Sequence, residues 1–422
     1  MNTPKIRFKG FKDDWEQRKL EDVMDTVTDY VAAGSFEDIR NNVTYLNEPG
    51  YAQLVRTVDL KKKFTNNDSV YVDESAFKYL WRVNLNDECI VLPNIGANIG
   101  EVYFVEPSGL PYDNNVLGPN AILLKANEDT YFAFTALNNL TFQKQLFENV
   151  GSSGQPKFNK TELKSIQLYM PQNEEQVKIG QYFRKLDHLI TLHQRKCDET
   201  KQLKKFMLQK MFPKNGEKNP EIRFEGFTDD WEQRKLSEIC ERITRKNRNN
   251  ESDLPLTIAS QFGLIDQRDF FNKVVAAKDM SNYYLLKKGE FAYNKSYSNG
   301  FDYGSIKRLN AYKQGCLSTL YICFGITSDE VESDYLECFF DTLKWYGDLS
   351  MICAEGARNH GLLNVDTKGF FDEVTVDLPK SLEEQKRISV YMNALNRLIT
   401  LHQRKCEKLK ELKKFMLQNM FV

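Results

Sequence analysis

The sequence is informative first through the chemistry that it lacks. It holds only four histidines in 422 residues, and it contains no GxxxxGK(S/T) phosphate loop, no Rossmann GxGxxG, no HExxH and no (D/N)PP(Y/F) tetrapeptide. Those motifs place the groups that bind nucleotides, metals or methyl donors. His193 and His402 fall on an expected helical seam, where a structural role is expected. A stand-alone nuclease or methyltransferase is therefore disfavoured, although it remains an alternative.

Disulfides and membrane spans are also not indicated. The eight cysteines include no CxxC pair and no spacing typical of metal sites, so buried free thiols are expected. No apolar run approaches 18 residues, and the N-terminal segment MNTPKIRFKG lacks the apolar region of a signal peptide. A hydrophobic content of 41% and a charged content of 28% are typical of globular proteins. These features predict a cytoplasmic chain of two or more domains.

A long stretch with helical periodicity occurs twice, at 174–212 and at 383–421. The two copies align without a gap at an offset of 209, and 19 of 24 positions match between Leu189–Phe212 and Leu398–Phe421. Apolar residues recur at three- and four-residue spacing over about five heptads. The spacing of Asn173 with Gln176, and of Ser381 with Glu384, predicts capping boxes. Each copy is therefore predicted to be one helix of roughly 58 Å.

A helix of that length with a narrow apolar seam needs a partner, and its own duplicate is the nearest candidate. If a pseudo-two-fold axis relates the two copies, the helices must run antiparallel, with one globule at each end. The predicted seam consists of Tyr182, Leu186, Leu189, His193, Leu203, Met207, Tyr391, Leu395, Leu398, His402, Leu412 and Met416.

A second repeat precedes each globular region. Residues 5–20 (KIRFKGFKDDWEQRKL) recur at 221–236 (EIRFEGFTDDWEQRKL), with 13 of 16 positions identical. The aromatic residues of these entry segments could stack on bases. Burial at the entrance of a fold is the preferred interpretation, because each segment leads directly into a globule.

The repeats divide the chain into six parts. These are an entry segment (1–20), a globule (21–172), a helix (173–213), a linker with the second entry segment (214–236), a globule (237–380) and a helix (381–422). Both globules read as mixed α/β. Predicted strands include Cys89–Leu92, Val102–Val105, Ala121–Leu124, Phe291–Tyr293, Leu320–Phe324 and Glu373–Val376. A duplication that kept its scaffold while the globules diverged indicates one shared task, assembly, and one task that each half performs differently.

Candidate DNA contacts lie in loops that mix amide, small polar, aromatic and basic groups. Readout of base edges uses such groups: Arg or Lys bonds to guanine, and Asn or Gln to adenine. Solvated loops have the same composition, so the assignment is a hypothesis. The candidates are Asn94, Asn98, Asn114, Asn115, Ser152, Ser153, Gln155 and Lys157 in the first globule, and Asn294, Lys295, Tyr297, Ser298, Asn299, Arg358, Asn359 and His360 in the second. The stretch Pro93–Gly100 is expected to be a strand-to-strand loop rather than a phosphate cradle, because it lacks the lysine and the following helix.

The formal net charge is −1, but the charge is unevenly distributed. Residues 174–214 carry ten Lys/Arg against five Asp/Glu, and residues 381–422 carry nine against four. A basic scaffold between mildly acidic globules argues against a protein that coats DNA generically. It permits a narrow basic groove or a surface for other subunits.

The chain resembles the specificity subunits of type I restriction-modification systems along its whole length. The entry segments (IRFKGF, DDWEQRKL), the joins PQNEEQVKI and PKSLEEQKRI, and the helix motif LITLHQRKC followed by LKKFMLQ carry the resemblance. YYLLKKGEFAYNKSY and GCLSTLYICF in the second globule are similar to that family's target-recognition domains. The resemblance implies an α+β protein in which two mixed α/β target-recognition domains are joined by two long helices, which form an antiparallel coiled-coil-like pair.

The same resemblance implies a function and a set of partners. Each globule would bind one half of a bipartite site on double-stranded DNA, and the helix pair would set the spacer and dock two methyltransferase subunits. S-adenosylmethionine would bind to those subunits, and ATP and Mg²⁺ to the restriction subunits. This chain itself would hold no catalytic, cofactor-binding or metal-binding residue. A two-headed protein-interaction scaffold that does not touch DNA is a further alternative.

Overall fold

The computed structural model describes residues 3–150, 156–259, 263–271, 276–297, 300–353, 358–359 and 362–422, and gives only the backbone at 358, 359 and 362. The chain forms two compact units. The first unit comprises Met1–Gln194 with Gln403–Val422, and the second comprises Arg195–His402. Each unit therefore contains one globule and part of both long helices, α8 (Asn173–Lys210) and α14 (Leu382–Asn419).

The globule of the first unit is built from short elements. In chain order they are β1 (Glu16–Lys19), α1 (Leu20–Val23), β2 (Met24–Asp29), η1 (Tyr30–Ala33), α2 (Phe36–Asn42), β3 (Ala52–Val55), α3 (Thr57–Lys61), β4 (Val70–Val72), α4 (Glu74–Tyr79), η2 (Trp81–Val83), β5 (Cys89–Pro93), β6 (Tyr103–Val105), η3 (Pro107–Gly109), β7 (Asn115–Leu117), β8 (Ala121–Ala126), α5 (Thr130–Leu137), α6 (Leu140–Glu148), α7 (Lys160–Lys164) and β9 (Gln167–Met170).

The second globule has a related series of elements. These are β10 (Glu232–Lys235), α9 (Leu236–Ile239), β11 (Cys240–Arg242), β12 (Leu256–Ala259), β13 (Gly263–Asp266), α10 (Gln267–Phe271), β14 (Tyr284–Lys287), β15 (Phe291–Asn294), β16 (Ser305–Arg308), β17 (Gln314–Leu317), β18 (Ile322–Ile326), α11 (Ser333–Asp341), α12 (Tyr346–Ile352), β19 (Arg358–Asn359), β20 (Leu362–Leu363), α13 (Thr367–Glu373) and β21 (Thr375–Leu378).

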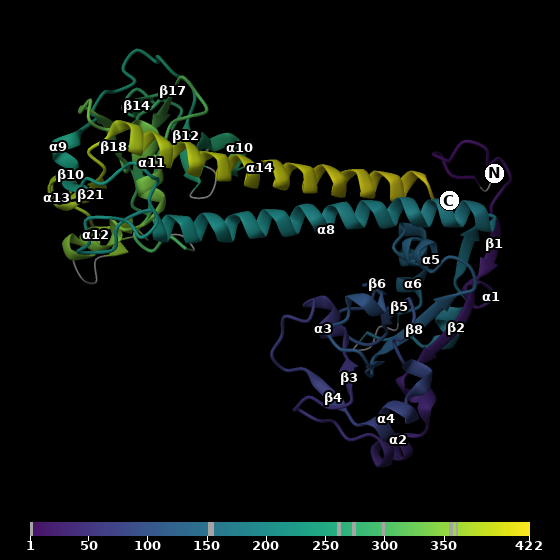
Figure 1. Cartoon of the computed structure of the whole chain (residues 1–422). Coiled ribbons are helices and arrows are strands. Elements are labelled where there is room, and N and C mark those ends of the chain that lie inside the picture. The colour runs from purple at the N-terminus through teal and green to yellow at the C-terminus, as the bar shows by residue number, and fades with distance from the viewer. Residues whose placement is uncertain are drawn as a thin grey trace. The chain divides into compact units, whose positions relative to one another are not determined.

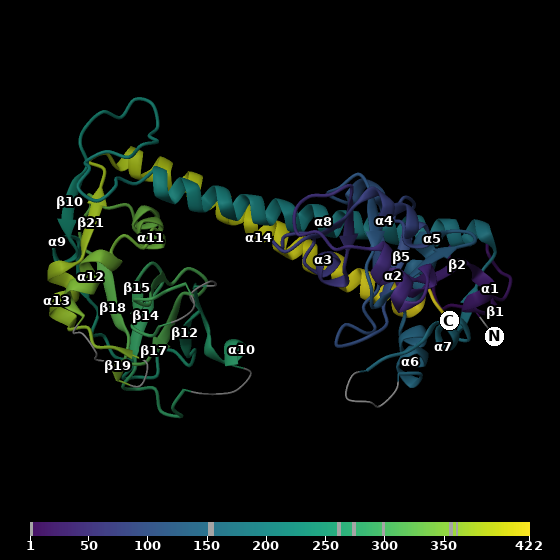
Figure 2. The same ribbon diagram turned by 90° about the horizontal axis from the view of Figure 1, so that it is seen from below.

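The two globules share a central antiparallel sheet despite their divergent sequences. Its strand order is β2-β8-β5-β6 in the first unit and β11-β18-β15-β16 in the second. In both, the strand of the entry segment pairs with the strand before the long helix, β1 with β9 and β10 with β21. Figure 1 shows α5 between the sheet of the first unit and α8, and Figure 2 shows β10 and β21 side by side in the second unit. The duplication therefore includes the globules.

The six predicted strands are all present, two of them shifted. β5, β6, β8 and β15 begin within one residue of the predicted starts, whereas β18 and β21 begin two residues later. The shift at β21 has a local cause, because Asp366 caps a helix through its side chain and that helix continues to Glu373. Pattern alone does not separate the end of such a helix from the start of the next strand.

Both long helices are present, with 38 residues each, or about 57 Å. Ser381 precedes α14, and its hydroxyl accepts a hydrogen bond from the Glu384 amide at 3.4 Å, as a capping residue does. The rest of the predicted capping boxes is wrong. Gln176 donates to the carbonyl of Pro171, and the Glu384 carboxylate binds an arginine instead of the helix end.

The helices run antiparallel within each unit. In the first unit, the Cys406 thiol donates to the Ile190 carbonyl at 3.9 Å. In the second unit, Cys197 donates to the Ile399 carbonyl, also at 3.9 Å. Both residues of one pair are offset by 209 from those of the other pair, so the helix contact of one unit is repeated at the equivalent positions of the other.

Eight of the twelve predicted seam residues are buried or half-buried. Leu186 and Leu395 are buried, and the side chains of Tyr182, His193, Met207, Tyr391, His402 and Met416 are half-buried. The other four are exposed: Leu189 is 39%, Leu203 43%, Leu398 44% and Leu412 40% exposed. In each case the next residue along the chain is less exposed. These residues are Ile190, Ile399, Lys204 and Lys413.

Each unit consequently carries the same three exposed apolar side chains on its helices, which we call the outer residues. They are Leu189, Leu412 and Phe415 in the first unit and Leu398, Leu203 and Phe206 in the second. Exposed apolar groups that gather on a surface are typical of interaction sites.

The C-terminal end of each long helix belongs to the core of a globule. Phe421 packs against Trp15, Phe132 and Phe183 in the first unit, with ring centroids 5.6–5.9 Å apart. Its equivalent in the second unit, Phe212, packs against aromatic rings that include Trp231.

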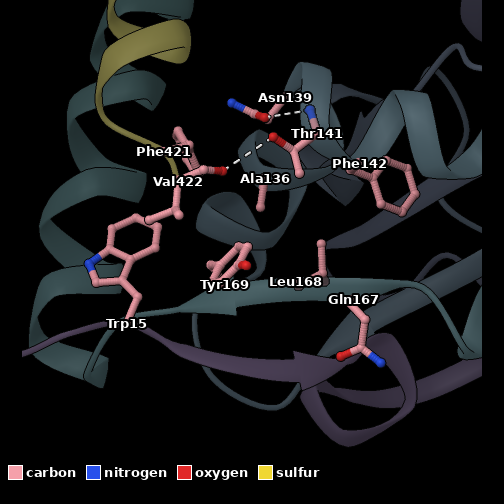
Figure 3. Close-up of a pocket in the computed structure, with 10 residues that line it drawn as sticks. All are labelled: Trp15, Ala136, Asn139, Thr141, Phe142, Gln167, Leu168, Tyr169, Phe421 and Val422. Atoms are coloured by element: carbon pink, nitrogen blue, oxygen red, sulfur yellow. Dashed lines mark hydrogen bonds between the residues drawn. The ribbon is translucent and has the colours of Figure 1, made fainter. Parts of the chain in front are cut away.

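The contact of the C-terminus with the first globule is visible in Figure 3. The Thr141 hydroxyl donates to the carbonyl of Val422 at 3.2 Å, as Figure 3 shows. The side-chain amide of Asn139 also donates to the Leu417 carbonyl, at 2.8 Å. The last residues of the chain and the entry segment thus close one core.

The entry segments are bound by buried ion pairs. The Arg7 guanidinium donates two hydrogen bonds to Glu175, at 2.7 and 2.8 Å, and Arg223 donates to Glu384 at 2.7 and 2.9 Å. Both glutamates are almost fully buried. The hydrogen bond to the glutamate raises the pKa of each arginine. Trp15 and Trp231 are buried, which confirms the burial interpretation over base stacking at these two positions.

All eight cysteines are free thiols, seven of them buried and Cys353 half-buried. Burial raises the pKa of Cys89 and of Cys240 to about 12. These observations confirm the prediction of buried free thiols. No helix in the described part of the chain is long and apolar enough to cross a membrane.

Candidate DNA interface

The candidate loops of the first globule emerge from one end of its central sheet. Strand register places Asp29 opposite Ile122 and Pro93 opposite Ala121. The C-terminal ends of β2 and β5 and the N-terminal end of β8 therefore lie at the same end of the sheet, because the strands are antiparallel. Loops there are supported by a rigid sheet, which is the usual placement of binding residues.

Two segments far apart in sequence pair at this end. The amide of Gly96 donates to the Pro156 carbonyl at 2.9 Å, and the amide of Phe158 donates to Asn94 O at 3.2 Å. Ile95 and Lys157 form an isolated β-bridge. We refer to the segments 94–100 and 156–158 as the paired loops of the first unit. They bring together Asn94, Asn98 and Lys157, of which Lys157 is exposed and the two asparagines are half-buried.

A lysine that sequence reasoning did not single out joins these loops. Lys61 Nζ lies 2.8 Å from Asn98 Oδ1 and 2.5 Å from Glu101 Oε1. Burial acts to raise the pKa of Glu101, but hydrogen bonds from Lys61 and Tyr103 hold it below its ordinary value. The run of three lysines at 61–63 is the signal in the sequence that could have found this residue.

The second unit repeats the arrangement. β15 ends at Asn294, whose side chain accepts a hydrogen bond from the Ser296 amide, and the Lys295 carbonyl accepts from the Leu363 amide at 2.9 Å. Arg358 and Asn359 pair through the backbone with Leu363 and Leu362. The paired loops of the second unit are therefore 294–297 with the backbone at 358–359 and 362–363. They collect Asn294, Lys295, Tyr297, Arg358 and Asn359, and Tyr297 is exposed.

Asn114 and Asn115 are not part of this cluster. They lie at the start of β7 and beside the start of β3, whereas α3 and Lys61 follow the other end of β3. The side-chain amide of Asn114 donates to the Tyr51 carbonyl, and that of Asn115 donates to the Tyr112 carbonyl. Asn115 is 3% exposed, so its amide serves the fold and cannot reach a base edge in this conformation.

Six candidates lie outside the described residues, namely Ser152, Ser153, Gln155, Ser298, Asn299 and His360. They belong to the same stretches of sequence as the paired loops, and their assignment stays a prediction.

Equivalent lysines of the two long helices pair with acids in both units. Lys413 bonds to Asp187 at 2.6 and 2.8 Å, and Lys204 bonds to Asp341 at 2.8 Å, as does Lys307. Burial alone would raise the pKa of Asp341, but the two ammonium groups lower it to about 2. The acid comes from α8 in the first unit and from α11 in the second, so a duplicated lysine has kept its role with a different partner.

No group of three or more His, Cys, Asp or Glu side chains among the described residues is arranged to hold a metal ion. The cavity drawn in Figure 3 has a volume of about 20 Å³, which is room for one or two water molecules and too small for a cofactor.

Comparisons with known proteins show what the chain is similar to. Residues 12–202 match the family described as "Type I restriction modification DNA specificity domain". This match lies in the first half of the chain. The second half repeats the same elements, as the shared sheet order shows.

Individual relatives are distant. A Methanocaldococcus jannaschii protein, described as a specificity subunit of the type I restriction enzyme MjaX, is 23% identical over 229 residues, which are 50% of this chain and 49% of that protein. The match thus spans about half the length of this curated relative. The crystal structure of a type I restriction-modification S subunit from M. genitalium covers 100% of this chain and 99% of its own, with a TM-score of 0.64 and 14% identity. At that identity the similarity establishes the fold.

Proposed function

We propose that the chain is the DNA-specificity subunit of a type I restriction-modification complex and is not itself an enzyme. Each globule reads one half of a bipartite site in double-stranded DNA. The helix pair sets the unread spacer between the halves. We place the complex in the cytoplasm.

The observation that carries this proposal is the repetition of the paired loops. Two globules of divergent sequence have the same sheet order, and each presents loops of different composition at the same end of that sheet. A binding domain that must read different bases in each copy needs this combination of a common frame and variable loops. Asn98 and Lys157 in the first unit, and Lys295 and Tyr297 in the second, are our candidates among the described side chains.

The duplicated outer residues support a second part of the proposal, the docking of two methyltransferase subunits. Each unit carries the same three exposed apolar side chains at repeat-equivalent positions. Two equivalent surfaces fit two copies of one partner. S-adenosylmethionine would bind to those partners, and restriction subunits that use ATP and Mg²⁺ would join them.

The energetics fit a modular reader with a net charge near zero. A wrong base pair costs about 1–3 kcal/mol, so a few contacts per half-site give useful discrimination. Phosphate contacts add affinity without sequence information, and partner subunits can supply many of them.

An exchange of one globule tests the proposal. Replacing residues 21–172 with the corresponding segment of another specificity subunit should change one half of the recognised sequence and leave the other half and the spacer unchanged. The recognised sequence is read by selecting randomised duplexes with the assembled complex. The reciprocal exchange of 237–380 is the matched control and should change only the other half.

Two results would argue against the proposal. A change in both halves after a single exchange would contradict two independent readers. Absence of any sequence preference in the wild-type complex would favour a scaffold that does not read DNA.

A further inference from the structure

The turn after α3 combines three lysines with a strained backbone. Lys61, Lys62 and Lys63 are all exposed. Lys63 and Phe64 have φ angles of 49° and 57°. This left-handed region is costly for residues with a β-carbon, and glycine and asparagine occupy it most readily. Lys63 therefore occupies a position where the backbone conformation favours glycine or asparagine.

Buried interactions hold the turn in this conformation. The Asp59 carboxylate is fully buried and accepts hydrogen bonds from Arg56 Nη2 at 2.8 Å and from Asn66 Nδ2 at 2.7 Å. The amide of Phe64 donates to Asp59 O at 2.9 Å, and the Phe64 ring packs against the core. Because the residues on both sides are fixed, the lysines are presented to solvent from a preorganised loop.

The turn lies beside the paired loops of the first unit. Lys61 reaches Asn98 and Glu101 from it. In the described part of the chain, neither Lys62 nor Lys63 has a carboxylate within salt-bridge distance. Lys78, on α4 of the same globule, is in contrast paired with Glu74 at 2.7 Å.

We propose that Lys62 and Lys63 bind the phosphate backbone of DNA next to the half-site that the first unit reads. The inference rests on the proposed function and adds to it the residues that position the duplex. Phosphate contacts fix the register and orientation of a protein on DNA and carry no sequence information themselves. Lys61 ties this backbone contact to the loop that holds Asn98, so a docked duplex would present its base edges to that loop.

The test is the salt dependence of DNA binding by the assembled complex, measured by fluorescence anisotropy with a labelled 30-base-pair duplex. Each phosphate contact contributes about 0.9 to the slope of log Kd against log salt concentration. The double variant Lys62→Gln/Lys63→Asn should lower that slope by about 1.8 and weaken binding at 50 mM salt by more than about tenfold. Asparagine is tolerated in the left-handed region, so Lys63→Asn should keep or raise the melting temperature.

Lys78→Gln is the matched control and should leave the slope unchanged. In the assembled complex, the double variant should select the same sequence as the wild type, because the lysines position DNA and do not read it. If the wild type binds DNA and the double variant shows the same salt slope as the wild type, this inference is overturned and the proposed function is not. A wild-type complex with no affinity for any duplex would overturn the proposed function as well.

Discussion

Replacing Phe421 with alanine is expected to lower the free energy of unfolding of the first unit by about 3–5 kcal/mol. Phe421 is one residue from the C-terminus but is only 8% exposed, and its ring contacts Trp15, Phe132 and Phe183. Removing the ring leaves a cavity among three aromatic side chains that cannot close without moving the entry segment or α8. Hydrogen exchange measured by mass spectrometry should show faster exchange in β5 and β8.

The chain provides two matched controls for this experiment. Phe415 lies six residues earlier, on α14, and is 52% exposed. Phe415→Ala should therefore change stability by no more than about 0.5 kcal/mol. Phe212 occupies the equivalent position of the repeat, so Phe212→Ala should increase hydrogen exchange in β15 and β18 and not in β5 and β8. Equal effects of Phe421→Ala and Phe415→Ala would show that the C-terminus is not part of the core.

Replacing Arg223 with alanine is expected to destabilise the second unit by about 3–5 kcal/mol. The substitution leaves the buried Glu384 carboxylate without its bidentate partner. Among the described residues, the Trp231 indole N–H, at 3.2 Å, is the one side-chain donor that remains. A buried charge that loses its partner costs far more than the net contribution of the intact pair. Chemical denaturation, followed with exchange in β10 and β21, measures the effect.

Arg387 supplies the control for this pair. It bonds to Glu383 near the start of the same helix, and both side chains are at least half exposed. Arg387→Ala should therefore cost no more than about 0.5 kcal/mol from loss of the ion pair. If Arg223→Ala destabilised the protein no more than Arg387→Ala does, the buried ion pair would not be what holds the entry segment.

The duplication and the long helices could be predicted from the sequence because they depend on identity and on periodicity. The sequence could not show whether Leu189 or Ile190 is the less exposed residue, because both are apolar and adjacent. A shift of one residue rotates a helix position by about 100°. Lys204 is not among the predicted seam residues. Its burial is possible because Asp341, 137 residues away in sequence, supplies the compensating charge.

The candidate site was predictable in part. Turn-forming residues after β5 and β15 indicated the loops. The structure brings the segment of Asn94 together with that of Lys157, and it brings Lys295 together with Leu363. Sequence composition could not separate Asn98 from Asn115, since an amide that holds a strand start and an amide in a binding loop look alike. The common sheet order of the two globules was also inaccessible, because their sequences have diverged while the alternation of buried strands has been kept.

Mapping DNA methylation across the genome of cells that carry the partner methyltransferase, with and without this chain, tests the central claim most directly. We predict methylation at a bipartite motif, with two specified halves separated by a spacer of fixed length and free sequence, and its complete loss when the chain is removed. A single contiguous motif, or a methylation pattern that does not depend on the chain, would contradict the assignment of two reading domains.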